Sequence, residues 1–492
     1  MQFTQEQGIL SVKGGNIMDE MQNNESRPAN PRRRKRSKMD IFKESYLPVL
    51  IAGFTLIFVL TTIIGSAVQS GQRKKLQEQA ELEASIAAQE EEKRLNAEAA
   101  RLVQQAAEHA ATHNYDHAIQ ALRSFSGEIA KYPQLSAALQ QYTEIKENMV
   151  LWNDPGKVLN LSFQLLIADP IRAFADESYG RAYNRNFVTT EEFRLILEQL
   201  YRGGYVLVSL DDIVEVQQTE DGSTFAPKEL YLPAGKKPLI LTQTHVNYNI
   251  FMTDGDGDKI PDKDGAGFAS KLITENGKLM NQYVDRDGSI VTGEYDLIPI
   301  LNSFIADHPG FSYHGAKAII AVTGYDGLFG YRTNPGAKEW LGADAYNQEI
   351  ESAKRIAQAI RDDGYDIACY TYENVGYGDM GLSQMQYDLK RWNDEVVPIL
   401  GTVDIMAFAQ ISDIAGHTPY SGEKYEELKN AGFRYYLGFC QDGTLWADTQ
   451  PEYFRQARIL VTGSNLKYNS QWFNGILDPV QILSSTRGDI PQ

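Results

Sequence analysis

The residues best placed to do chemistry follow a short apolar strand in the middle of the chain. The segment Lys237–His245 begins with a Lys-Pro pair, continues through Leu239–Leu241 and ends in Thr244 and His245. A short apolar run that is entered through a proline and leaves into a polar loop is typical of a buried parallel strand. In α/β folds the functional groups lie just beyond the carboxyl ends of such strands. We therefore expect Thr244, His245 and Asn247 to belong to a functional site.

A second group of candidate ligands is the acidic loop after this strand. Aspartates recur there at short intervals, at Asp254, Asp256, Asp258, Asp262 and Asp264. Carboxylates at this spacing can surround a hard cation with oxygen atoms, as EF-hand loops do. The pattern is similar to the calcium repeats of thrombospondin type 3 and dockerin modules, although Lys259 stands where an EF-hand uses glycine. We expect the loop to bind calcium, and the alternative is a solvated acidic turn.

Other metal-ligating residue types are sparse. Beyond residue 157 the histidines are His245, His308, His314 and His417, and no two of them have the spacing of ligands on one helix. The two cysteines, Cys369 and Cys440, form no Cys-x-x-Cys motif, which excludes a disulfide scaffold and a zinc–thiolate site. We expect two buried thiols on strands, with a single disulfide as the alternative.

Alternating strands and helices must position these residues. The apolar runs predict strands at Tyr205–Leu210, Leu239–Thr244, Ala318–Thr323, Asp366–Tyr370, Val403–Ala409 and Arg434–Phe439. Helices are predicted at Phe193–Arg202, Tyr295–Asp307, Ala343–Asp362, Ser383–Leu400 and Gly422–Asn430, the first preceded by a capping box of Thr189 and Glu192. This alternation predicts an α/β fold in which a parallel sheet closes, or half closes, into a (β/α) barrel over residues 157–480.

Several of these segments resemble the polysaccharide deacetylases, the NodB homology family of carbohydrate esterases. The resemblance rests on the Lys-Pro strand and on Glu198–Asp212, Gly267–Leu272, Gly315–Ile320, Thr323–Arg332 and Gly364–Tyr372. Three of them, Gly267–Leu272, Gly315–Ile320 and Thr323–Arg332, are similar to a membrane-anchored branch of the family from Gram-positive bacteria. The resemblance implies a (β/α) barrel of the polysaccharide-deacetylase type.

The resemblance also implies a catalytic apparatus that this chain does not retain. Family members hold a divalent metal with one aspartate and two histidines, beside an aspartate base and a histidine acid. The two aspartates of the Thr-Phe-Asp-Asp motif fall on Thr244 and His245, and the two histidines fall on Tyr370 and Asn374. A tyrosine phenol is protonated near neutral pH and an asparagine amide is a poor zinc ligand. The third motif is replaced at Ala409–Gln410, and no C-terminal Leu-x-Ile-His occurs. We expect no catalytic zinc or other divalent metal, and hence a pseudoenzyme.

Polysaccharide binding is the function that the resemblance still implies. Side chains near the former active-site loops are expected to stack on sugar rings and to make polar contacts: Tyr248, Arg332, Tyr372 and Tyr377. We expect a protein of the bacterial cell envelope that binds or organises cell-wall or capsular polysaccharide without hydrolysing it. The alternatives are an active metal-dependent deacetylase with a rearranged site and a structural or protein-interaction module.

The N-terminal part predicts a membrane anchor. Residues 1–45 form a polar tail, expected to be disordered, that contains the basic run Arg32–Lys38. The next segment, Tyr46–Val68, has no charged residue and as a helix is long enough to cross a bilayer core of roughly 30 Å. The positive-inside rule then places the N-terminus in the cytoplasm and the remainder of the chain outside the cell, behind an uncleaved signal anchor that spans residues 46–68.

A helical stalk and a helical hairpin are expected between the anchor and the barrel. Residues 70–103 are rich in Ala, Glu and Gln, which favours a long helix. Residues 101–150 resemble one tetratricopeptide-type hairpin around Asn114–Asp116, and a single copy must pack against the stalk, the barrel or a protein partner. His109, His113 and His117 recur at a helical interval, but the turn interrupts their face, so we expect solvated histidines.

The charge of the chain excludes one class of partner. The formal net charge is −18 over 492 residues, and the basic tail 1–45 makes the rest of the chain more acidic still. Because phosphate binding requires a basic surface, we expect no nucleic-acid partner.

Overall fold

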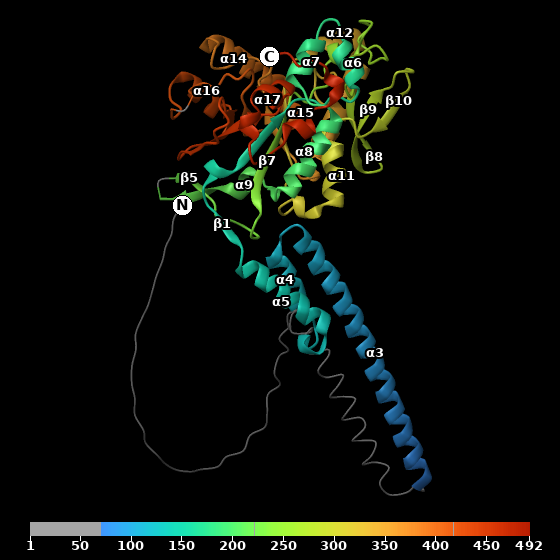
Figure 1. The fold of residues 1–492 in the computed structure, drawn as a ribbon. Coiled ribbons are helices and arrows are strands. Elements are labelled where there is room, and N and C mark those ends of the chain that lie inside the picture. The colour runs from blue at the N-terminus through green and yellow to red at the C-terminus, as the bar shows by residue number, and fades with distance from the viewer. Residues whose placement is uncertain (1–69, 221, 417) are drawn as a thin grey trace, which may run out of the picture. The chain divides into compact units, whose positions relative to one another are not determined.

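The computed structural model describes residues 70–492, except residues 221 and 417 (Figure 1). The predicted membrane anchor at residues 46–68 and the basic tail 1–45 lie outside the described residues. Within the described part of the chain, no helix is both long and apolar enough to cross a membrane.

Seven parallel strands close into a barrel in the described residues. In order around the ring they are β7 (Lys237–Thr244), β11 (Ile319–Val322), β12 (Asp366–Cys369), β13 (Ile405–Ala407), β14 (Tyr435–Phe439), β16 (Phe454–Leu460) and β2 (Leu159–Phe163). Strand β7 closes the ring because it pairs with β2 on one side and with β11 on the other. The predicted (β/α) barrel is therefore confirmed.

A short apolar layer closes the amino-terminal end of the barrel. Strand β3 (Tyr205–Leu207) pairs with the first part of β7, and it is followed by α9 (Leu210–Ile213). The hairpin of β4 (Val214–Thr219) and β5 (Gly222–Pro227) comes next, and then β6 (Leu230–Leu232). Inward-facing side chains of the barrel strands pack against these elements in one buried cluster. The predicted strand 205–210 ends early because the backbone N–H of Ser209 is capped by Asp212 (2.8 Å) at the start of α9.

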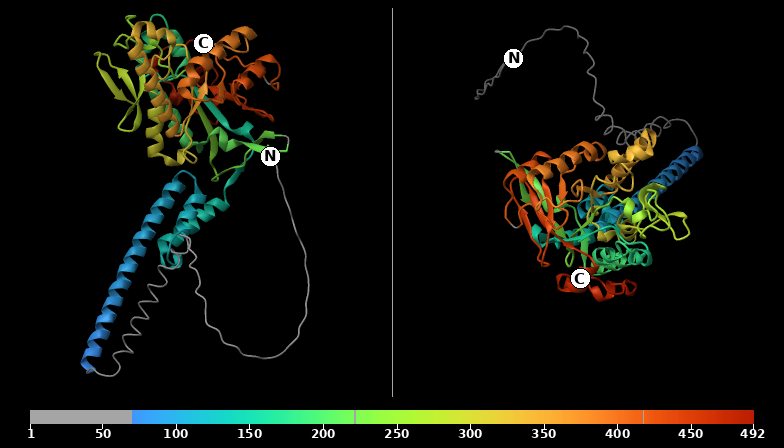
Figure 2. Two further views of the ribbon diagram at one scale, coloured as in Figure 1. Left: turned by 180° about the vertical axis from the view of Figure 1, so that it is seen from behind. Right: turned by 90° about the horizontal axis from the view of Figure 1, so that it is seen from above.

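Helices cover the outside of the barrel, as Figures 1 and 2 show from several sides. The main ones are α8 (Thr190–Arg202), α11 (Leu297–Asp307), α13 (Ala343–Asp362), α14 (Leu382–Arg391), α15 (Val397–Leu400), α16 (Glu423–Asn430) and α17 (Gly463–Tyr468). The predicted capping box of Thr189 and Glu192 is confirmed at the start of α8. The predicted helix 383–400 is wrong in one respect, because a π-helical turn at Trp392–Val396 separates α14 from α15.

The loops at the carboxyl ends of the strands carry further short elements. They contain α6 (Pro170–Ala175), α7 (Gly180–Asn186), α10 (Ile250–Thr253) and α12 (Lys338–Leu341). An antiparallel sheet of β8 (Lys271–Glu275), β9 (Lys278–Val284) and β10 (Ile290–Gly293) lies outside the barrel. Strand β15 (Ala447–Thr449) pairs with β16, strand β1 (Val150–Trp152) pairs with β6, and α18 (Pro479–Ile482) lies near the C-terminus. Cys369 and Cys440 are both free and buried, as predicted.

Three helices form the module that precedes the barrel. They are α3 (Ser70–Ala111), α4 (Tyr115–Arg123) and α5 (Pro133–Glu147), and α3 continues through the predicted boundary near residue 103. Small residues of α3 such as Ala99 and Ala106 pack against the apolar faces of α4 and α5. The expectation of solvated histidines is wrong for His113, which is buried and bonds through Nε2 to the carbonyl oxygen of Gly310 in the barrel (2.8 Å). The hairpin therefore has packing partners within its own chain.

Candidate functional site

A polar site lies at the carboxyl-terminal end of the barrel. We call this end the mouth and define it by Thr244, His245, Tyr325, Tyr370 and Arg458. The first four residues end or directly follow β7, β11 and β12, and Arg458 projects from β16. The carboxyl ends of parallel strands meet at one edge of a barrel, so residues far apart in sequence converge here.

A hydrogen-bonded layer inside the barrel separates the mouth from the closed amino-terminal end. Thr242 donates its hydroxyl to Asn160 Oδ1 (3.1 Å), and Asn160 Nδ2 donates to Gln456 Oε1 (3.1 Å). Along β7, Ile240 belongs to the buried apolar cluster, Thr242 to this layer and Thr244 to the mouth, because alternate residues of a strand face the same side. The three polar side chains are fully buried, and their mutual bonds offset the cost of removing them from water.

His245 is held as a neutral imidazole. Its Nε2 accepts a hydrogen bond from Asn249 Nδ2 (2.8 Å) and lies 3.1 Å from the hydroxyl of Tyr325. Burial lowers the pKa of His245 to about 4, because the charged form loses its hydration inside the protein. Since Nε2 acts as the acceptor, the ring proton is assigned to Nδ1. At neutral pH this histidine is a weak base whose Nε2 is already engaged.

Thr244 and Tyr370 occupy the positions next to this imidazole. Thr244 Oγ1 donates to the carbonyl oxygen of Phe163 (3.2 Å), and the Tyr370 ring lies 6.4 Å from the His245 ring. Burial raises the pKa of the Tyr370 phenol, while Arg458 and a hydrogen bond with Thr244 act in the opposite direction. Both groups are therefore neutral hydroxyls near pH 7, and neither supplies a negative charge to the mouth.

Arg458 places a positive charge inside the barrel. Its guanidinium is fully buried and donates to the carbonyl oxygens of Phe408 (2.8 Å) and Gly438 (3.2 Å), with the Phe439 ring 4.7 Å away. Nη1 has no hydrogen-bond partner, and no carboxylate among the described residues forms an ion pair with this side chain. Burial lowers the pKa of Arg458 to about 10, so the group remains charged at neutral pH.

The residues of the mouth do not fit a catalytic divalent metal. A zinc site needs three protein ligands such as imidazoles, carboxylates or thiolates. The mouth offers one imidazole with an engaged Nε2, three hydroxyl groups and a buried guanidinium that repels a cation. Asn374 lies in the same loop as Tyr370, and its Oδ1 is buried without a hydrogen-bond partner among the described residues. An amide oxygen of this kind does not replace a histidine ligand.

Backbone strain is concentrated in the loops around the mouth. Residues other than glycine with positive φ follow β7, β11, β12 and β13, namely His245 (64°), Tyr248 (50°), Phe329 (57°), Thr371 (59°), Asn374 (54°), Gln410 (55°) and Ile411 (54°). A β-branched residue such as Ile411 strongly disfavours this conformation. Strained residues persist where the surrounding structure holds them, and they cluster at binding and catalytic sites.

The residues predicted to stack on sugar rings are not on an open surface. Tyr248, Tyr372 and Tyr377 are at most 1% exposed, and Arg332 is buried as well. The Tyr377 hydroxyl donates to Asp388 Oδ1 (2.6 Å), and Arg332 donates to the carbonyl oxygen of Tyr248 (2.8 Å). Tyrosine is equally suited to a core and to a binding surface, and the sequence alone did not distinguish the two. These four side chains are packed within the loops, and contact with a sugar by any of them stays a prediction.

Asp296 holds the loop after β7, and sequence reasoning missed it. Its carboxylate accepts hydrogen bonds from Tyr248 (2.7 Å), from Gln243 Nε2 (2.6 Å) and from the backbone N–H of Leu166 (2.9 Å). Burial raises the pKa of Asp296 to about 6, although these hydrogen bonds act in the opposite direction. Asn249 was also missed, although it is only four residues beyond His245. Tyr325 and Arg458 were missed because they are distant from His245 in the sequence.

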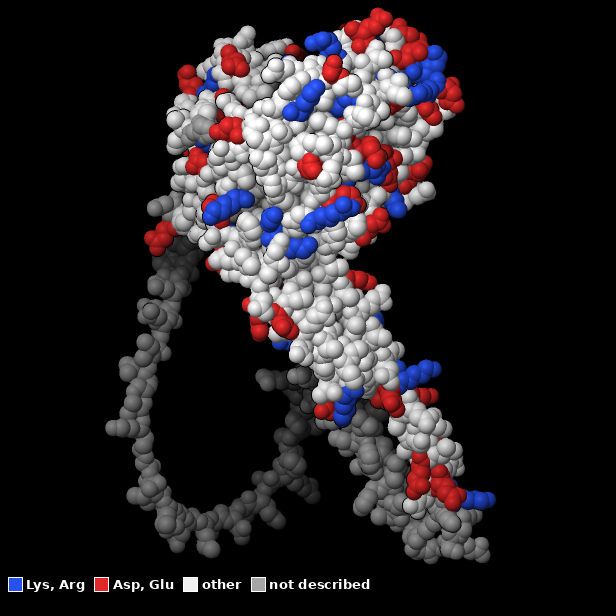
Figure 3. All heavy atoms as spheres, in the orientation of Figure 1, with Lys and Arg blue, Asp and Glu red and all other residues white. Residues whose placement is uncertain are grey.

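The aspartate loop gathers part of the predicted calcium ligands. Carboxylate oxygens of Asp254, Asp256 and Asp262 lie within 4.8 Å of one another. Asp258 instead caps the backbone N–H of Ile260 (2.8 Å), and Asp264 pairs with Lys263 (2.9 Å). Figure 3 shows acidic side chains gathered at the upper edge of the barrel, near α12. Calcium binding by this loop stays a prediction.

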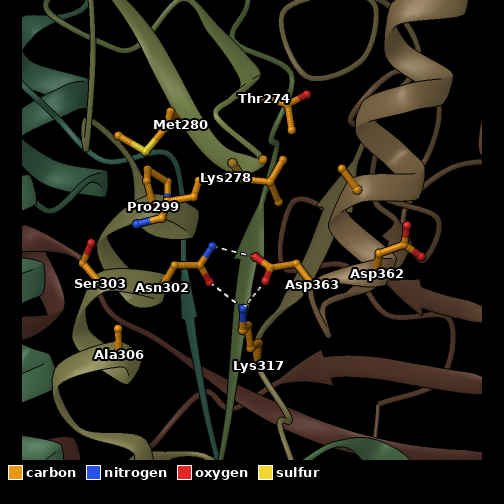
Figure 4. Close-up of a pocket in the computed structure, with 13 residues that line it drawn as sticks. Thr274, Lys278, Met280, Pro299, Asn302, Ser303, Ala306, Lys317, Asp362 and Asp363 are labelled. Carbon is orange, nitrogen blue, oxygen red and sulfur yellow. Dashed lines mark hydrogen bonds and ion pairs between the residues drawn. The ribbon is translucent and has the colours of Figure 1, made fainter.

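A groove on the outer surface is separate from the mouth. It has a volume of about 460 Å³ and lies between α11, α13 and the turn from β8 to β9 (Figure 4). Lys317 Nζ donates to Asp363 (2.6 Å) and to Asn302 (2.7 Å), and Asn302 Nδ2 donates to Asp363 (2.6 Å). These three polar groups of the groove therefore bond to one another.

Comparisons with known proteins give a structural likeness only. No family model and no curated protein matches this chain. In structure it is similar to a Streptococcus pyogenes deacetylase, PplD, solved in complex with acetate. The TM-score is 0.33 and the sequence identity 10%, with 67% of this chain and 98% of that chain covered.

The burial of His245 predicts a dependence of stability on pH. The unfolded chain binds a proton with a pKa of 6.5 and the folded chain with a pKa of about 4. Protonation therefore favours the unfolded state, and stability present above pH 6.5 should be lost as the pH falls to 4. The loss should be about 3 kcal/mol. The measurement is chemical denaturation of the wild type and of His245→Gln, whose side chain does not titrate.

As the pH falls from 6.5 to 4, the free energy of unfolding of the wild type should decrease more than that of His245→Gln. His308→Gln, a change near the protein surface, serves as the control and should follow the wild type. Parallel curves for the wild type and His245→Gln would contradict the buried, neutral state of His245.

The aspartate loop predicts stabilisation by calcium. A cation that binds only the folded form should raise the melting temperature by a few degrees at millimolar calcium. Asp256→Asn removes a charged ligand while keeping a side chain that can cap the backbone, and it should abolish the rise. Asp287→Asn, an exposed aspartate of another turn, is the matched control. Equal melting temperatures of the wild type in chelator and in calcium would identify the loop as an acidic turn.

Proposed function

We propose that this protein is a membrane-anchored, extracellular barrel that binds cell-envelope polysaccharide at the mouth without hydrolysing it. The observation that carries the proposal is the mouth itself. It combines the strained loops of a ligand site with side chains that cannot hold a catalytic metal. A barrel end that is strained and polar, and whose five mouth residues include no carboxylate, suits recognition of a neutral, hydroxyl-rich ligand better than hydrolysis.

The deacetylase resemblance supports polysaccharide as the ligand class. The motifs that carry it surround the mouth, because Thr244 and His245 end or directly follow β7, Tyr370 directly follows β12, and both strands pair with β11. The metal and base positions are altered, whereas the strands and loops that present them are kept. The proposal is therefore a barrel of the polysaccharide-deacetylase type that still binds polysaccharide but has lost the residues for hydrolysis.

Restoring the family residues tests this proposal. The variant Thr244→Asp, His245→Asp, Tyr370→His and Asn374→His should take up zinc or cobalt, because it regains an Asp-His-His ligand set. The wild type should not. The measurement is metal stoichiometry after dialysis, and the variant with only Tyr370→His and Asn374→His is the control for partial ligand sets.

Stoichiometric zinc in the wild type would contradict the proposal and favour an active enzyme with a rearranged site. A folded fourfold variant that takes up no metal would contradict the assignment of these positions to the family motif. Circular dichroism and the melting temperature establish whether each variant is folded.

Membrane anchoring is supported by the sequence of residues 46–68 and by the helix that comes after them. The helix α3 begins at Ser70 and is polar on most of its surface before it reaches the module of α4 and α5. A solvated helix in this place is suited to a spacer between a bilayer and the barrel.

Protease digestion of intact cells checks the orientation. An extracellular barrel predicts that added protease digests residues beyond the stalk while residues 1–45 are protected. The readout is immunodetection of tags at the two ends of the chain, with lysed cells as the control for cleavage of both ends. Protection of the C-terminal tag in intact cells would contradict the proposed topology.

A further inference from the structure

Two exposed aromatic rings touch each other at the carboxyl-terminal side of the barrel. The centroids of the Tyr179 and Phe251 rings are 5.3 Å apart, and the rings are 46% and 44% exposed as residues. Among the described residues, this is the one contact between two aromatic side chains that are both this exposed. Apolar surface in contact with water is unfavourable, and rings held together in this way offer a surface that a ligand can cover.

The barrel topology brings these rings together. Tyr179 lies between α6 and α7 in the connection after β2, and Phe251 lies in α10, directly after β7. Strands β2 and β7 are parallel neighbours, so the loops at their carboxyl ends lie side by side. Figure 1 shows α6 and α7 at the end of the barrel to which the strands point.

Buried rings fix the position of Tyr179. Its ring lies 5.9 Å from that of Tyr183, which in turn packs against Phe268 at 5.0 Å. Asp176 Oδ1 accepts the backbone N–H of Tyr179 (2.6 Å). The Tyr179 hydroxyl forms no hydrogen bond with any described residue. Tyr179 thus presents a ring in a fixed position and a hydroxyl group without a hydrogen-bond partner among the described residues. Because the ring is already fixed, little conformational entropy is lost when a ligand binds.

One loop joins the ring pair to the mouth. Phe251 is two residues beyond Asn249, whose Nδ2 donates to His245 Nε2 (2.8 Å) and to the Tyr325 hydroxyl (3.1 Å). The first helical N–H of α10, that of Ile250, is capped by Asp326 Oδ2 (2.7 Å). The same loop therefore presents His245 inward and Phe251 outward.

The size and chemistry of the patch favour a sugar ring as its occupant. A pyranose ring has an apolar face of C–H groups, which can stack on an aromatic ring, and hydroxyl groups at its edge, which can bond to the Tyr179 hydroxyl. Two half-exposed rings cover far less than the roughly 800 Å² per partner of a stable protein interface. A second copy of this chain would need much more apolar surface here.

We propose that Tyr179 and Phe251 form a stacking subsite for a pyranose unit of the polysaccharide bound at the mouth. This inference rests on the proposed function and adds to it the side chains that hold the glycan. They take the place of the four predicted residues, whose side chains are buried.

Binding of soluble chitin oligosaccharides and of glycan strands from bacterial cell wall to the full-length protein in detergent tests the subsite. Isothermal titration with Tyr179→Ala and with Phe251→Ala should show affinity reduced about tenfold or more in each case. Phe251→Tyr keeps a ring and should bind like the wild type. Tyr387→Ala, which removes an exposed tyrosine from α14, is the matched control and should also bind like the wild type.

The outcomes of this experiment separate the two proposals. Wild-type binding that survives both alanine substitutions would overturn the subsite and leave polysaccharide binding at the mouth standing. A wild type that binds neither glycan probe would overturn the proposed function, and the subsite with it. Sedimentation of the same variants gives a further outcome, because a loss of self-association with unchanged glycan binding would identify the rings as an interface between copies and overturn the subsite.

Discussion

The triple pairing of β7 is the constraint on which the rest of the structure depends. This strand pairs with β2 along one edge, and along the other edge with β3 near its start and with β11 near its end. The barrel therefore closes around β7, and its amino-terminal end is filled by the elements after β3. The chain leaves the carboxyl end of β7 at the mouth, and its path there sets the positions of Thr244, His245 and Phe251. A change in β7 register would move every one of these side chains.

Charge then determines what the mouth can do. The inward-facing groups beneath it are hydroxyls, amides and the guanidinium of Arg458, which has no carboxylate partner among the described residues. In a low-dielectric interior this charge opposes a second cation, and the neutral His245 does not offset it. The mouth thus keeps the geometry of a strand-end site while its electrostatics differ from those that a metal-dependent hydrolase requires. Binding of a neutral glycan is compatible with both properties.

The parts of the fold with strong periodic signals were predictable from the sequence. Strands β7, β11, β12, β13 and β14 and helix α13 were found because each has an apolar pattern of the right period. Strand β16 was missed because Arg455 and Arg458 interrupt its apolar run, although both guanidinium groups are buried. The hairpin β4–β5 was missed because its strands are mostly exposed and polar.

Only those residues of the site that lie at the carboxyl ends of predicted strands could be predicted from the sequence. The convergence of Thr244, His245 and Tyr370 follows from the parallel topology and is confirmed by their contacts. The contacts of Tyr325 and Arg458 depend on pairings distant in sequence, which no local pattern encodes, whereas Asn249 is only four residues beyond His245. The sequence also did not show which side chains are exposed. Tyr248 and Tyr179 are the same residue type, yet Tyr248 is buried and Tyr179 is exposed. The membrane anchor, the calcium site and the deacetylase type of the barrel stay predictions.

The proposed function requires that the barrel bind polysaccharide without cleaving its acetyl groups. The most direct measurement combines retention of wild-type protein on N-acetylated cell-wall polysaccharide with proton NMR detection of free acetate in the same sample, with zinc or cobalt added. Binding without hydrolysis predicts retained protein and no acetate above the protein-free control. Acetate that accumulates in proportion to protein and time, and stops on addition of chelator, would contradict it.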